Sequence, residues 1–146
     1  MNTLRTLTIV FNLFIIIGAG HGIAPLGLFE VMSLTNLFSG DFQFNISGRY
    51  DERLMTVGLI SVLGQSILIS SYFFDKEVKS KLTIIGCFIL FAATFLLTKD
   101  ALNIHSIDIL SLFTALPFIG TGVVLLIREI KGPKNKIEPG GQRASR

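Results

Sequence analysis

Two side chains with acid–base potential stand nine residues apart near the end of the first apolar stretch, His21 and Glu30. A histidine beside a carboxylate can carry protons, act as a general base or contribute to a metal site. In one continuous helix, nine residues turn the chain by about 900°, which places the two side chains on opposite faces. They can meet only if the chain breaks between them, and Pro25, which lacks a backbone N–H, favours such a break.

A membrane enzyme with its site at the outer interface, built from His21, Glu30 and His105, is therefore one hypothesis. His21 lies ~25 Å along a helix that begins at Leu4, near the interface, where a histidine bonded to a neighbouring helix or to water is the favoured interpretation. Metal sites usually need three or four protein ligands, so this pair is a weak signal even if Asp100 contributes. We predict no metal and no cofactor.

Small and polar residues recur at helical spacing and could form either packing surfaces or a ligand pocket. Gly18 and Gly22 form a GxxxG pattern, which favours close helix packing in lipid over room for a ligand. Gly58, Ser61 and Gln65 lie on one face of a later apolar run. We interpret Gln65 as a structural clamp and expect it to hydrogen-bond across the structure, with Asn12 as the partner.

Four long apolar runs must position these residues. The chain has 146 residues, of which half are hydrophobic, and a net charge of +3. Such runs with almost no interior charge are typical of membrane helices, which need about 20 residues to cross ~30 Å of hydrocarbon. We predict an all-α, four-transmembrane-helix bundle in residues 1–130, with spans at 4–24, 54–74, 82–98 and 107–127. Residues 131–146 are basic and rich in proline and glycine, and we predict a disordered tail.

The one long connection follows the first run. Pro25 should end the first helix, and residues 26–38 predict a short amphipathic helix on the outer membrane surface. Residues 41–47 alternate between apolar and polar side chains, a strand-like pattern over a very short stretch. A cleaved signal peptide is the alternative interpretation of the first run, although apolar character continues past its glycines.

The distribution of lysine and arginine predicts the topology. Ten of these residues lie on one side of the four predicted spans and three on the other. The positive-inside rule then places both termini in the cytoplasm, and we predict a bacterial inner membrane. The ten are Arg5, Lys76, Lys79, Lys81, Arg128, Lys131, Lys134, Lys136, Arg143 and Arg146, and the three are Arg49, Arg53 and Lys99.

The composition and the placement of charged residues disfavour some classes of function but do not identify one. The basic residues lie where topology puts them, so we predict the lipid bilayer as partner, with a second copy or another membrane subunit, and no nucleic acid. No ionisable residue lies in the middle of spans two to four, which disfavours ion-coupled pumps. The favoured hypothesis is a non-enzymatic accessory subunit or a binder of lipid or another apolar ligand. The alternatives are the interfacial enzyme and a small oligomeric transporter.

Overall fold

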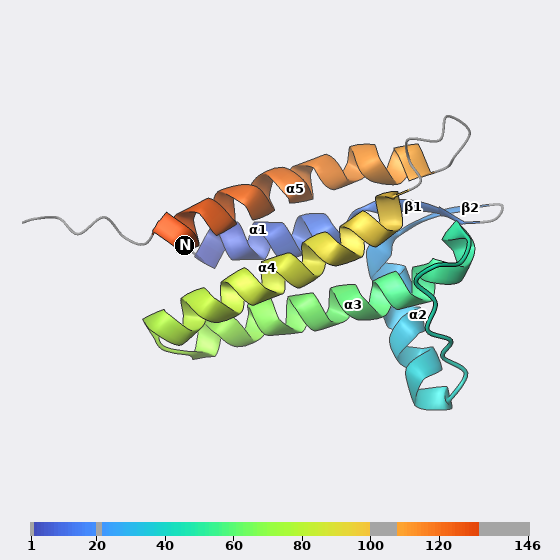
Figure 1. Cartoon of the computed structure of the whole chain (residues 1–146), viewed down its shortest axis with the longest axis horizontal. Helices are drawn as coiled ribbons and strands as arrows, with labels where there is room; N and C mark the ends of the chain where they lie inside the picture. Colours follow the sequence, from blue (N-terminus) through green and yellow to red (C-terminus); the bar gives the residue numbers. More distant parts are fainter. Residues whose placement is uncertain (1, 20–21, 100–107, 132–146) are drawn as a thin grey trace, which may run out of the picture.

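The computed structural model describes residues 2–19, 22–99 and 108–131, and most of these residues are helical. The described elements, in chain order, are α1 (Asn2–Leu13), β1 (Ile16–Ala19), β2 (Gly22–Pro25), α2 (Leu26–Ser39), α3 (Tyr50–Ser70), the 3₁₀ turn η1 (Ser71–Phe73), α4 (Lys76–Thr98) and α5 (Asp108–Lys131). In Figure 1, α1, α3, α4 and α5 run side by side, whereas α2 leaves them at a steep angle.

Three helices are long and apolar enough to cross a membrane: Tyr50–Phe73, Lys76–Thr98 and Ile109–Lys131. The helices expected over 54–74, 82–98 and 107–127 are therefore confirmed as helices. Two of them begin several residues earlier than expected, because the polar residues before each apolar run also join the helix. The helix expected over 26–38 is confirmed as α2.

The expectation of one helix over residues 4–24 is wrong. α1 ends at Leu13, and the chain then forms an antiparallel hairpin in which Ile16 pairs with Pro25 and Ala19 with Gly22. Two local preferences explain the break. The consecutive β-branched residues at 15–17 favour extended backbone, and glycines at 18, 20 and 22 weaken a helix.

Two hydrogen bonds tie this hairpin to the helices. The Ile16 N–H donates to Thr114 Oγ1 of α5 at 2.9 Å, and the Leu26 N–H donates to the Ile15 carbonyl at 2.7 Å. Pro25 is the residue before α2 and has extended backbone, as its fixed φ and the missing N–H favour.

Two other expectations concern the connection and the tail. Residues 41–47 alternate in polarity but lie in no strand among the described part of the chain. They have no neighbouring strand to pair with, and alternation alone does not satisfy backbone groups. The tail expected over 131–146 lies outside the described residues, except for Lys131, which ends α5.

Glycines on α3 and α4 allow close packing within the chain, whereas Gly120 of α5 faces open space. A Cβ on Gly58 would lie 2.7 Å from the Phe29 carbonyl oxygen of α2. A Cβ on Gly86 of α4 would lie 3.0 Å from the Gly64 carbonyl oxygen of α3. The packing interpretation therefore holds for the contacts of Gly58, whereas Gly18 and Gly22 form no helical GxxxG, because both lie in the hairpin strands.

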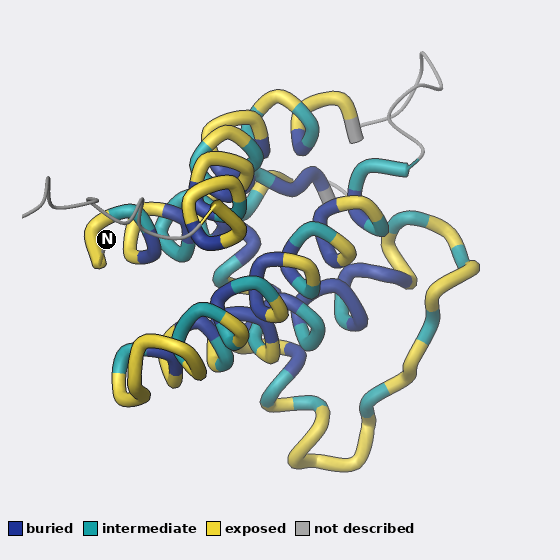
Figure 2. Tube along the Cα trace, turned by 60° about the vertical axis from the view of Figure 1, so that its left-hand side comes forward, coloured by how far each residue is buried: buried dark blue, intermediate teal, exposed yellow. Residues whose placement is uncertain are grey.

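The first two helices bury several polar side chains, although α2 also buries Leu26 and Phe29. The buried residues of α1 are all polar: Arg5, Thr8 and Asn12. In α2, Glu30 and Ser33 are buried, whereas Val31 and Phe38 are 61% and 86% exposed. Figure 2 shows exposed residues running along the outside of the helices. This polarity is the reverse of that of a water-soluble helix and suits surroundings of lipid.

Candidate functional site

The buried face of α1 carries three polar side chains at helical spacing. Arg5, Thr8 and Asn12 stand at positions i, i+3 and i+7, so they lie in a row, and each is fully buried. The row extends about 10 Å along the helix at 1.5 Å per residue. We call these three residues the polar face of α1. Burying a polar group is unfavourable unless it finds a partner, so the contacts of each member indicate what the row does.

One end of this face meets α2 and α3 in a compact cluster. Gln65 Nε2 of α3 donates to Asn12 Oδ1 at 2.8 Å and to Glu30 Oε1 of α2 at 2.7 Å. Ser61 lies one helical turn from Gln65 on the same side of α3 and is fully buried. Asn12, Glu30, Ser61 and Gln65 are each at most 8% exposed. We call these four residues the polar junction.

Two buried atoms of the polar junction have no hydrogen-bond partner within the described residues, Asn12 Nδ2 and Ser61 Oγ. Nearly all buried polar side-chain atoms in proteins are hydrogen-bonded to protein or to ordered water, so each exception needs an explanation. A water molecule or a small polar species would satisfy the hydrogen-bonding capacity of these two groups. The hydrogen bonds within the polar junction therefore do not satisfy all of its buried polar groups, as those of a purely structural contact would.

Among the described residues, no charged side chain acts on the Glu30 carboxyl group. It belongs to α2, outside the three long apolar helices. Burial raises the pKa of Glu30 to about 7, and the hydrogen bond from Gln65 acts in the opposite direction. Burial dominates because it removes the water that stabilises the charged form. A carboxyl group with this pKa exchanges its proton near neutral pH.

The other end of the polar face of α1 holds a buried ion pair. Arg5 Nη2 and Glu129 Oε1 of α5 are 2.6 Å apart, and the two side chains are 0% and 4% exposed. Arg5 Nε and Nη1 have no hydrogen-bond partner in the described part of the chain. The Cys87 thiol of α4 lies close enough to interact electrostatically with both charged groups. A buried charge with unused donors is a second incomplete polar environment, about 10 Å from Asn12 along α1.

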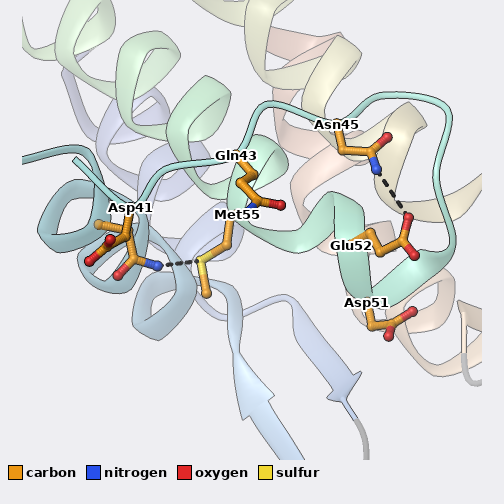
Figure 3. Close-up of a pocket in the computed structure, with 7 residues that line it drawn as sticks. Asp41, Gln43, Asn45, Asp51, Glu52 and Met55 are labelled. Carbon is orange, nitrogen blue, oxygen red and sulfur yellow. Dashed lines mark hydrogen bonds between the residues drawn. The ribbon is translucent and has the colours of Figure 1, made fainter. Parts of the chain in front are cut away.

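A separate pocket of about 540 Å³ opens at the surface beside α2 and the start of α3. Figure 3 shows the Asn45 amide turned toward the Glu52 carboxylate, with which it forms a 3.0 Å hydrogen bond. Asp41 and Asp51 also line the pocket. No group of three or more metal-ligating side chains occurs among residues 2–19, 22–99 and 108–131. Acidic residues on an open surface are well solvated, and this pocket has no buried polar group that lacks a partner.

The structure brings together some of the site residues that were predicted from the sequence. It brings Gln65 to Asn12, which confirms that contact, and it adds Glu30 as a second partner. Gly18, Gly22 and Pro25 lie in the hairpin rather than at a helix-packing surface. His21 and His105 lie outside the described residues, so the hypothesis of a site that joins His21 to Glu30 has no structural description.

Sequence reasoning missed Arg5, Thr8 and Glu129. Arg5 was counted only as a charge flanking the membrane runs, and Glu129 and Thr8 were given no role. The available signal was the i, i+3, i+7 spacing of Arg5, Thr8 and Asn12 within an otherwise apolar stretch. That spacing predicts one polar face on a helix whose other faces meet lipid.

Comparisons of the chain with protein-family models, with curated proteins and with solved structures found no match.

Proposed function

We propose that the chain is a multi-pass membrane protein, not an enzyme, that carries a small charged solute across the membrane through the polar face of α1 and the polar junction. The observation that carries this proposal is the fully polar buried face of α1. In membrane proteins, polar and ionisable side chains that face the interior commonly mark solute or proton pathways. The buried side chains at the junction are amides, a hydroxyl and one carboxyl, groups suited to binding a polar solute.

The proposal includes four membrane crossings, the first of them made by α1 and β1 together. The 12 residues of α1 extend about 18 Å. Residues 14–19 extend about 20 Å more at ~3.3 Å each. The sum exceeds the ~30 Å of the hydrocarbon core. Irregular backbone at membrane depth is tolerated where protein covers it, and transporters place binding sites at such breaks in a helix.

Contacts at one end of the molecule support a topology with both termini in the cytoplasm of a bacterial inner membrane. Tyr72 hydroxyl donates to the Asn2 carbonyl at 3.1 Å, and Lys79 Nζ lies 3.4 Å from Asn2 Oδ1. With Arg5 bound to Glu129, the start of α1, the α3–α4 turn and the end of α5 lie together. Most of the lysine and arginine residues that the structure describes therefore share one end, as the positive-inside rule requires of a cytoplasmic side.

A reporter fused after Arg146 tests this topology. We expect alkaline phosphatase at that position to be inactive and a green fluorescent protein to fluoresce, because the first needs the periplasm and the second the cytoplasm. The same reporters placed after Gly40, in the connection between α2 and α3, should give the opposite pair of signals. Active phosphatase after Arg146 contradicts the proposed orientation.

The sequence has no ionisable residue in the middle of the three long helices, and this disfavours a transporter. A buried ionisable group nevertheless packs against one of these helices, because Glu30 of α2 contacts Gln65 of α3. An accessory role, with binding of lipid or of a partner subunit, is the other function compatible with the exposed apolar faces. It remains a prediction, as does assembly into a homo-oligomer.

Flux into proteoliposomes tests the proposed function. The full chain is reconstituted into vesicles that contain a pH-sensitive or a sodium-sensitive dye, and a potassium diffusion potential is applied with valinomycin. We expect flux of one of the two ions to exceed that of protein-free vesicles and to fall to that background in Asn12→Leu. The control is Ser66→Ala, whose side chain is exposed on the opposite side of α3. Vesicles with wild-type protein that leak no faster than protein-free vesicles rule out the function.

A further inference from the structure

We propose that the polar junction is a monovalent-cation site, in which the cation and a proton compete for Glu30. The inference rests on the proposed function and names the solute class that its site takes. Three observations carry it: the oxygen-rich side chains of the junction, the end of α1 beside them, and the buried Ser61 hydroxyl, which has no partner in the described residues.

The side chains supply the oxygen ligands. Gln65 Nε2 lies between Asn12 Oδ1 and Glu30 Oε1, at 2.8 and 2.7 Å. The amide N–H₂ group therefore holds together two oxygens that would otherwise repel each other. Rotation of the Gln65 amide by 180° replaces this donor by an oxygen. The junction then presents three side-chain oxygens, from Asn12, Glu30 and Gln65, to one cation. The Ser61 hydroxyl, one helical turn from Gln65 on the same side of α3, is the nearest further oxygen on that helix face that has no partner in the described residues.

The end of α1 adds a favourable field. α1 stops at Leu13, within the packed helices and one residue after Asn12. The last carbonyl groups of a helix carry partial negative charge, and they point beyond its C-terminus. Interrupted membrane helices use such carbonyl ends to coordinate Na⁺ or to favour a proton. Here the Ile15 N–H bonds back to the Asn12 carbonyl and the Phe14 N–H to the Val10 carbonyl, at 3.2 Å each.

The charge balance selects a monovalent ion. Glu30 is the one ionisable group of the junction, and α2 carries no other. Arg5 on α1 is about 10 Å away along the helix and is paired with Glu129, and Arg53 on α3 is about 18 Å from Gln65. One carboxylate neutralises one positive charge in surroundings where uncompensated charge is unfavourable. A proton or a monovalent cation achieves that balance, whereas a divalent cation leaves an excess charge.

Thermal unfolding of the full chain in lipid nanodiscs tests the site. Cys87 is the lone cysteine and is fully buried, so its reaction with a fluorogenic maleimide reports unfolding. At pH 8 we expect NaCl, KCl or LiCl to raise the Tm by about 4–6 °C over choline chloride of equal ionic strength, when the cation is at ten times its Kd. At pH 5 the shift should vanish, because the proton then occupies Glu30.

Variants separate the site from general effects of salt. Glu30→Gln should lose the cation-dependent shift, whereas Glu77→Gln, an exposed carboxylate on α4, should keep it. Ser61→Ala should raise the cation concentration needed for half of the shift without lowering the Tm in choline, so it tests the site even if Glu30→Gln fails to fold. An absent cation-specific shift at pH 8, or an equal shift in Glu30→Gln, overturns the site. A shift without vesicle flux retains the site and overturns the transport function.

Discussion

Replacing Arg5 by methionine is expected to lower the free energy of unfolding by about 3–5 kcal/mol. The Arg5–Glu129 pair is 2.6 Å long and almost fully buried, so the substitution leaves the Glu129 carboxylate without its counter-charge inside the protein. The loss is large because an unpaired buried charge is much less stable than a paired one. The measurement is thermal or denaturant unfolding in detergent micelles, followed by the exposure of the Cys87 thiol.

A second substitution distinguishes the ion pair from simple packing. In the double variant Arg5→Met/Glu129→Leu no charge remains buried, so most of the lost stability should return. Arg128→Met is the matched control, because Arg128 is next to Glu129 in sequence but exposed. A double variant that is less stable than Arg5→Met alone contradicts the account of this end of α1.

Glu30→Gln is expected to make the protein more stable than the wild type by about 3 kcal/mol at pH 8 in choline buffer, and equally stable at pH 4. The pKa of Glu30 is raised from 4.5 to about 7 in the folded state. Between those values the folded state binds the proton more tightly than the unfolded state does. Wild-type stability therefore falls as the pH rises from 4.5 through 7, and the neutral amide removes that loss.

The comparison requires measurements across pH on both proteins. Exposed carboxylates such as Glu77, which accepts a hydrogen bond from Lys81, affect both proteins equally and cancel in the difference. A constant difference in Tm between wild type and Glu30→Gln from pH 4 to 8 shows that Glu30 does not change its protonation state in this range. It then has no role as a proton or cation ligand.

The long helices followed from the sequence because uniform apolar runs of about 20 residues have few alternatives in a membrane. The first apolar run does not form one long helix, although its length and hydropathy resemble those of the other runs. Local preference decided the difference: the β-branched residues at 15–17 and the following glycines favour a hairpin whose backbone groups bond to each other and to Thr114. The number of apolar residues in a run does not distinguish a continuous helix from such a hairpin.

One contact of the candidate site was predictable from the sequence, but the site as a whole was not. The Asn12–Gln65 contact followed from two lone amides in apolar runs, each of which needs a partner in lipid. Glu30 was placed at the outer surface, because its helix begins after a proline and a break. The packing of Phe29 against Gly58 brings α2 onto α3 and turns Glu30 inward, and no sequence pattern specifies that contact between distant segments.

The protonation of Glu30 tests the central claim most directly. The full chain with ¹³C-carboxyl glutamate is placed in lipid bilayers, and the Glu30 signal is identified by its absence in Glu30→Gln. Solid-state NMR then follows its chemical shift with pH, first in choline chloride and then in NaCl, KCl or LiCl. We predict a midpoint near 7 in choline and a lower midpoint with at least one of the three cations, because cation and proton compete. A midpoint near 4.5 that no cation changes contradicts a buried, ion-binding Glu30.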